Sequence, residues 1–196
     1  MSKIKLAPGT LTAPVPPTLV SCGTLEAPNT FTVGWTGIIN TKPPMTYISV
    51  RPSRFSYELI KNSGEFVINL PSSNLVRTVD SCGVKSGRDI DKFKTFGITA
   101  EESFNVSAPS IAECPVSIEC KVKQIIPLGT HDMFISDIVG ISVKEELINK
   151  NGRLCLDRAG LMAYIHGEYF TIGKKIGSFG YSVKKSSKGK KAPKKK

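Results

Sequence analysis

The amino-acid sequence predicts a mainly β fold with helical insertions, arranged as a β-barrel. Three observations support this class: many short apolar runs rich in β-branched and aromatic residues, frequent turn signals between them, and few helical patterns. The strands do not alternate with helices as a doubly wound parallel sheet requires, and the chain shows no internal repeat. Its 196 residues are enough for one domain with its own hydrophobic core.

The expected elements follow in chain order. Proline-rich residues 1–16 form an extended lead-in, and residues 40–44 break the chain. β-branched and aromatic runs predict strands over residues 19–22, 31–35, 45–50, 65–70, 118–127, 133–143, 161–165 and 169–172. Two helices are predicted, through residues 56–62 and 75–82, with Ser53 as the N-terminal cap of the first.

The net charge of +11 belongs mostly to the end of the chain. Residues 184–196, KKSSKGKKAPKKK, hold eight lysines and no acid, and removing them leaves +3 for residues 1–183. This tail has almost no apolar side chain to bury, so we expect it to be disordered outside the folded domain of residues 1–183. It could contact nucleic acid or an anionic surface, but a solubilising role is favoured because the domain shows no basic, aromatic groove.

The five cysteines indicate the redox state of the cellular compartment in which the protein resides. They are scattered, none forms a CxxC pair, and no histidine spacing suggests zinc, so we expect no metal site. We interpret them as reduced thiols, mostly buried, in a cytoplasmic protein. No apolar run is long enough for a secretory signal or a membrane span.

Two neighbouring predicted strands each end in polar or small residues. Arg51, Ser53, Arg54 and Ser56 in RPSRFS supply the guanidinium groups and hydroxyls that bind a phosphate, although a capped helix with solvated arginines is the alternative. Before them, the small residues of GWTG at 34–37 would let a planar ligand approach the backbone, with the flat face of Trp35 beside it. A core tryptophan explains that segment equally well.

Two further segments contain side chains that could donate hydrogen bonds to a ligand. SGRDIDKF at residues 86–93 brings Arg88, Lys92 and Phe93 into a loop that could reach the same ligand, or could simply be solvated. HGEYFTIG places His166 and Tyr169 at a turn, and His131 lies in another. A lone histidine is more often structural, and no nucleophile–base pair, paired carboxylates, GxGxxG or P-loop is present.

Taken together, these blocks resemble a known family. NTFTVGWTGIINTKPPMTYISVRPSRFSYELI, FVINLP, SGRDIDKF, LGTHDMFISDIVGI and HGEYFTIGKKIG, in this order over residues 12–180, resemble the flavoredoxin branch of the flavin reductase-like family. The resemblance implies an FMN-binding split β-barrel that forms a homodimer, with FMN bound near the subunit interface.

The resemblance also implies roles for individual residues. Asn29 and Thr32 would lie beside the isoalloxazine, and the backbone of Trp35, Thr36, Gly37 and Ile38 would contact its polar edge. Ser49, Arg51, Ser53, Arg54 and Ser56 would surround the ribityl phosphate. Lys92 would add a donor with Phe93 as packing. Tyr164, His166 and Tyr169 would line the far side of the flavin, either within the same chain or from the other subunit. Many relatives have threonine in place of Ser56, which keeps the hydroxyl.

The implied activity is an FMN-dependent oxidoreductase that accepts a hydride from NADH or NADPH. The chemistry would belong to the flavin, which agrees with the absence of a catalytic side-chain constellation. Two alternatives stay open. One is an electron carrier that receives its electrons from a redox protein and has no nicotinamide site. The other is a surface- or nucleic-acid-binding protein acting through the tail, although we expect no nucleic-acid partner.

Overall fold

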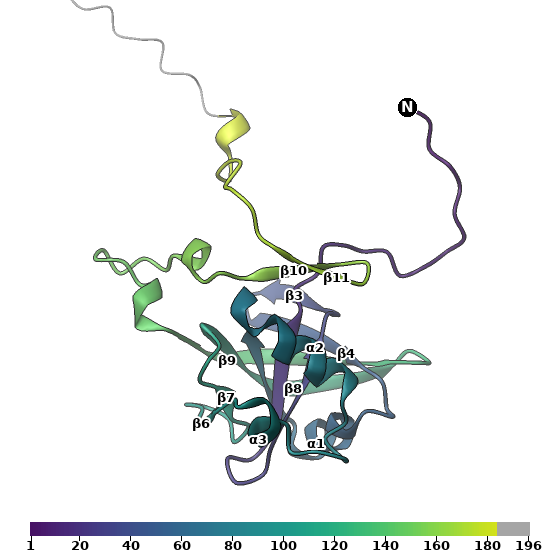
Figure 1. The fold of residues 1–196 in the computed structure, drawn as a ribbon, viewed down its shortest axis with the longest axis vertical. Coiled ribbons are helices and arrows are strands. Elements are labelled where there is room, and N and C mark those ends of the chain that lie inside the picture. Colours follow the sequence, from purple (N-terminus) through teal and green to yellow (C-terminus); the bar gives the residue numbers. More distant parts are fainter. Residues whose placement is uncertain (184–196) are drawn as a thin grey trace, which may run out of the picture.

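The computed structural model describes residues 1–183, so the predicted disordered tail lies outside the described residues. A seven-stranded sheet with the order β2-β1-β5-β8-β9-β4-β3 forms the body (Figure 1). Every neighbouring pair in it is antiparallel. The predicted mainly β class with helical insertions is therefore confirmed.

The elements have the following bounds. The sheet comprises β1 (Thr18–Gly23), β2 (Pro28–Val33), β3 (Thr36–Thr41), β4 (Pro44–Val50), β5 (Glu65–Leu70), β8 (Val116–Pro127) and β9 (Asp132–Val143). Two small antiparallel pairs are β6 (Ala100–Glu101) with β7 (Ser110–Ile111), and β10 (Met162–Ile165) with β11 (Glu168–Thr171). The helices are α1 (Phe55–Ser63), α2 (Val76–Val84) and α3 (Lys92–Phe96), with short 3₁₀ turns at Ser73–Leu75, Glu145–Leu147, Leu156–Arg158 and Tyr181–Val183.

Most predicted elements are found within one to three residues of their expected ends, but three predictions are wrong. Residues 36–41 form β3 instead of leading into a break, and the turn to β4 is confined to Lys42 and Pro43. Ser53 does not cap α1: Arg54 occupies that position, and no side chain accepts a hydrogen bond there. The loop expected over residues 86–93 ends early, because Asp91 accepts a hydrogen bond from the Lys94 backbone and starts α3.

Alternation along the strands builds two cores on opposite faces of the sheet. In β1, Val20 and Cys22 point into the barrel, whereas Leu19 points toward the side covered by α2 and α3. The barrel core consists of Val20, Cys22, Phe31, Val33, Ile48, Val50, Tyr57, Ile60, Phe66, Ile68, Cys120 and Phe134. The helix-side core consists of Leu19, Val79, Cys82, Phe93, Ile98, Ile111, Cys114 and Met162.

Four of the five cysteines are buried, as expected, and Cys155 is partly exposed. Burial raises the pKa of Cys22 to about 11, so its thiol stays protonated at neutral pH. Among the helices of the described chain, none has the length and apolar character needed to cross a membrane.

A buried hydrogen bond holds α1 on the sheet. The Tyr57 hydroxyl donates to Asp132 Oδ2 at 2.5 Å, and the Tyr57 ring packs edge-on against Phe134 at 5.3 Å between centroids. That bond is the main cause that raises the pKa of Tyr57 to about 12, and burial adds to it. Because Asp132 pairs with Val50 in the β9–β4 register, the start of α1, the end of β4 and the start of β9 meet at one place.

Candidate functional site

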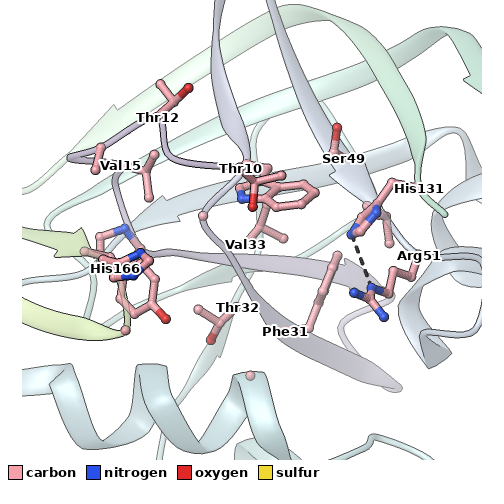
Figure 2. A pocket seen from close by; sticks show the side chains of 18 of the residues that line it. Thr10, Thr12, Val15, Phe31, Thr32, Val33, Ser49, Arg51, His131 and His166 are labelled. Atoms are coloured by element: carbon pink, nitrogen blue, oxygen red, sulfur yellow. Dashed lines mark hydrogen bonds between the residues drawn. The ribbon is translucent and has the colours of Figure 1, made fainter. Parts of the chain in front are cut away.

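A cavity of about 510 Å³ lies between β2, the end of β4, the β10–β11 hairpin and the N-terminal segment; we call it the main cavity. Figure 2 shows Thr12, Val15 and His166 toward one end of it and Arg51 and His131 at the other. Its aromatic lining residues are Phe31, Trp35, His131, Tyr164, His166 and Tyr169. Flat apolar walls with a few polar groups suit a planar ligand.

A second cavity, of about 230 Å³, adjoins the first; we call it the basic cavity. Its cationic lining residues are Arg51, Arg54, Lys85, Arg88 and Lys92, and its hydroxyls come from Ser53, Ser56 and Ser86. Phe31, Arg51 and Arg54 line both cavities, so one ligand can occupy both. In the described part of the chain, no Asp or Glu lines either cavity. The pair therefore fits a ligand with a planar body and an anionic end.

Arg51 and His131 meet because β4 ends where β9 begins. Arg51 Nε donates to His131 Nε2 at 3.4 Å, drawn as the dashed line in Figure 2. The His131 ring lies 4.6 Å from the Trp35 ring, centroid to centroid, at an interplanar angle of 40°. Burial, with the charges of Arg51 and Arg54, lowers the pKa of His131 below its ordinary 6.5. At neutral pH the ring is therefore uncharged, with a lone pair on Nε2 that accepts from Arg51.

Arg54 is held against the end of α2. Its Nη1 donates to the Gly83 carbonyl at 3.1 Å. α2 itself rests on β2, because the Thr32 hydroxyl donates to the Val79 carbonyl and a Cβ at Gly83 would lie only 3.3 Å from Thr32 Cβ. These contacts place the Arg54 guanidinium on the wall that the two cavities share.

Lys92 is the buried cation of the basic cavity. Only 4% of it is exposed, and its ammonium donates to the carbonyls of Thr30 and Cys82, both at 2.8 Å. Burial is the main cause that lowers the pKa of Lys92 below its ordinary value, and Arg54 adds to it. Since an ammonium has three donors, one N–H is left for an anion in the cavity that Lys92 lines.

Ser56 supplies a buried hydroxyl to the basic cavity, and Asn29 positions it. Asn29 Nδ2 donates to Ser56 Oγ at 2.7 Å and makes a longer contact, 3.6 Å, with Cys22 Sγ. Asn29 does not line either cavity. Its amide is therefore linked to the basic cavity through Ser56.

The structure brings together ten of the fifteen predicted site residues. Those lining the main cavity are Thr32, Trp35, Ser49, Arg51, Arg54, His166 and Tyr169. Those lining the basic cavity are Arg51, Ser53, Arg54, Ser56 and Lys92. Five line neither cavity: Asn29, the β3 residues Thr36, Gly37 and Ile38, and Phe93, which belongs to the helix-side core as expected of a packing residue. Ile38 is 69% exposed.

Sequence reasoning missed His131 as part of the ligand site, and also Thr10 and Thr12. The sequence indicates only that His131 lies in a turn; the signal that could have found it is the pairing of the strand that follows it, β9, with β4, which ends just before Arg51. The N-terminal segment reaches the cavity because Val15 and Tyr164 exchange two backbone hydrogen bonds, of 3.0 and 2.8 Å. Nothing in the proline-rich segment indicates that partner.

The hairpin that carries His166 is fastened to α2. Tyr169 donates its hydroxyl to Asp80 Oδ1 at 3.2 Å, and its ring lies 5.1 Å from that of Tyr164. Burial first, and then Asp80, raises the pKa of Tyr169 to about 12, so it stays a donor at neutral pH. The far wall of the main cavity is therefore formed by this chain itself.

Fold and site together define a β-barrel protein whose joined cavities have the shape and charge to suit a planar ligand with an anionic end. Residues 11–173 match the family model described as the flavin reductase like domain, and the chain belongs to that family. The structure is similar to the flavoredoxin of Desulfovibrio vulgaris (Miyazaki F), with a TM-score of 0.86 and 30% identity, covering 93% of this chain and 100% of that one.

Two further relatives agree. A flavoredoxin from Methanosarcina acetivorans has a TM-score of 0.83 and 26% identity, covering 94% of this chain and 100% of that chain. An uncharacterised protein of Archaeoglobus fulgidus is 30% identical over 147 residues, 75% of this chain and 82% of that protein. The predicted family and the split-barrel class are thereby confirmed. Family membership supports flavin-related redox chemistry, either as an oxidoreductase or as an electron carrier.

The Arg51–His131 contact predicts a measurable shift. In Arg51→Ala, the pKa of His131 should rise toward 6.5, because a neighbouring cation is lost and the ring becomes more accessible to water. NMR titration of the His131 ring between pH 4.5 and 8 measures it. Lys42→Ala, which removes an exposed cation before the opposite end of β4, is the matched control. An unchanged His131 titration in Arg51→Ala would contradict the contact.

Proposed function

We propose that this protein is an FMN-binding oxidoreductase that takes electrons from NADH or NADPH, or passes electrons through bound FMN. The observation that carries the proposal is the joining of an aromatic cavity to a basic one through Arg51 and Arg54. An isoalloxazine suits the first and a phosphate monoester suits the second. The donor set without carboxylates favours a phosphorylated flavin over riboflavin.

The phosphate would be held where the cavities meet. Arg51 and Arg54 line both cavities and offer guanidinium forks, while Ser53 and Ser56 offer hydroxyls. Lys92, which lines the basic cavity, would contribute its remaining N–H. Charge-assisted bonds of this kind are about twice as strong as neutral ones, so these residues would provide much of the affinity.

The ring system would occupy the main cavity. Trp35 is 43% exposed, lines this cavity and packs against the His131 ring. When bound, a flavin supplies hydride and single-electron transfer by itself. The chain's residues orient the ring, shield it from water on the side of the hairpin, and keep positive charge at its phosphate end. No side chain in the cavities is required to act as an acid or a base.

Reduction of the bound flavin tests the function. The purified protein should be yellow, and NADH or NADPH added without oxygen should bleach its flavin band, with free FMN offered in parallel as substrate. Bleaching supports the oxidoreductase. A yellow protein that neither nucleotide bleaches, but dithionite does, identifies an electron carrier without its own nicotinamide site. A colourless protein that does not take up FMN would refute both.

Arg54→Ala should separate FMN from riboflavin. The variant removes a charge-assisted bond that only FMN can make, worth roughly 1.5–3 kcal/mol, so FMN affinity should fall about 10- to 100-fold. Riboflavin affinity should change much less, as measured by quenching of flavin fluorescence. Arg77→Ala, an exposed arginine of α2 outside both cavities, is the control. Equal losses for both ligands would place Arg54 away from the phosphate.

We also propose that the protein forms a homodimer. The segment after β11 projects from the body in Figure 1, and its apolar side chains are exposed in the single chain: Ile172, Ile176, Phe179, Tyr181 and Val183. Apolar exposure of this kind favours burial against a second copy. Because the segment continues the hairpin that lines the main cavity, dimerisation and flavin binding should be linked.

Dilution tests the assembly. Sedimentation over a range of protein concentrations, read at the flavin band, should show flavin released together with monomer, because each event favours the other. Truncation after residue 173 should weaken the dimer by removing the apolar segment. A monomer that keeps full FMN affinity at every concentration would rule out the linkage.

A further inference from the structure

The rim of the basic cavity holds cations that a single phosphate does not need. Lys85 and Arg88 line this cavity but not the main one, so they lie beyond the shared wall formed by Arg51 and Arg54. The loop between α2 and α3 carries them. Together with Arg51, Arg54 and the buried Lys92, they make five cationic side chains around a space of about 230 Å³.

The rim is a built structure. Arg88 Nη1 donates to the Ser53 carbonyl at 3.1 Å, and its guanidinium lies 5.7 Å from the centre of the Phe55 ring. The loop packs tightly on the wall: a Cβ at Gly87 would lie 2.2 Å from Asn29 Oδ1 and 2.6 Å from Phe55 Cδ1. Only glycine allows this approach. Arg88 is therefore presented at the cavity mouth with several N–H groups left over.

Acidic partners do not neutralise these cations within residues 1–183. The ion pairs found there join Lys121 to Glu65 and Lys123 to Asp137, and involve none of the five. Asp91, on the same loop, caps α3, and Asp89 is exposed and does not line the cavity. The positive charge is thus available to a ligand.

The positive charge around the basic cavity exceeds what one phosphate monoester neutralises. Such a group carries about −1.5 to −2 at pH 7, against five cations here. Arg51, Arg54 and Lys92 suffice for the first phosphate, which leaves the rim without an anion.

We propose that Lys85 and Arg88 form a subsite for a second phosphoryl group beside the flavin phosphate. This inference rests on the proposed function. The group can come from two sources with the same chemistry: the second phosphate of FAD, or a phosphate of the nicotinamide nucleotide. The Arg88 fork recognises its oxygens, and Lys85 adds a point charge.

Two binding measurements on the full-length protein test the subsite. Flavin-free protein is titrated with FMN and with FAD, followed by flavin fluorescence, and FMN-loaded protein is assayed for the KM of NADH and NADPH. The variants are Arg88→Ala, Lys85→Ala and Arg88→Lys, with Arg77→Ala as the control. If FAD supplies the group, Arg88→Ala should weaken FAD about ten-fold and FMN less than three-fold, with Arg88→Lys in between.

If the reductant supplies the group, the same variants should raise the nucleotide KM by a similar factor, while the ratio of FAD to FMN affinity stays constant. Equal weakening of FMN and FAD would assign Arg88 to the first phosphate and overturn the proposal. An unchanged ratio with an unchanged KM would overturn it as well. If wild-type protein binds FMN and these variants behave like Arg77→Ala, only the subsite fails; if it binds neither flavin, the proposed function fails too.

Discussion

The arrangement of both cavities depends on the hydrogen bonds of the buried Lys92 ammonium. They join β2 to the end of α2 through the carbonyls of Thr30 and Cys82, and Lys92 itself is the first residue of α3. A buried charge without a carboxylate is costly unless another anion compensates it. Burial lowers the pKa of Lys92, and an anion in the basic cavity would raise it again, so anion binding and protonation support each other.

The remaining contacts turn this local constraint into a complete site. The Tyr57–Asp132 bond brings α1 to the point where β4 ends and β9 begins, which places Arg51 beside His131. Glycine at position 83 lets α2 approach β2, and Arg54 then reaches the carbonyl at that position. Arg54, Arg88 and Lys92 are thus held by backbone carbonyls, and Arg51 is held by the His131 ring. None of these four forms an ion pair with an acidic residue within residues 1–183.

The sequence predicted the strands well, because buried β-branched runs such as MTYISV leave little choice of structure. Arg51, Ser53, Arg54 and Ser56 of RPSRFS do line one cavity, because they are close in the chain, while anion binding there stays a prediction. Sequence-based prediction failed where tertiary contacts determine the structure. The N-terminus of α1 forms without a cap from Ser53, whose carbonyl accepts a hydrogen bond from Arg88. β3 forms because it pairs with β4. His131 joins Arg51 across 80 residues through strand register, which no local pattern reveals.

The distribution of charge also sets the direction in which a ligand can lie. Cations gather at one end of the joined cavities, whereas Val15 and the hairpin residues that line the other end, Tyr164, His166, Gly167 and Tyr169, include no Lys, Arg, Asp or Glu. In the proposed complex, the charged end of the ligand would lie toward Lys92 and its planar end toward Trp35. On that planar side the N-terminal segment is joined to the hairpin by one two-bond bridge between Val15 and Tyr164. In the proposed complex, the planar end of the ligand would therefore lie beside a segment held by two backbone hydrogen bonds, and its anionic end would lie beside Lys92, which is buried and fixed by two carbonyls.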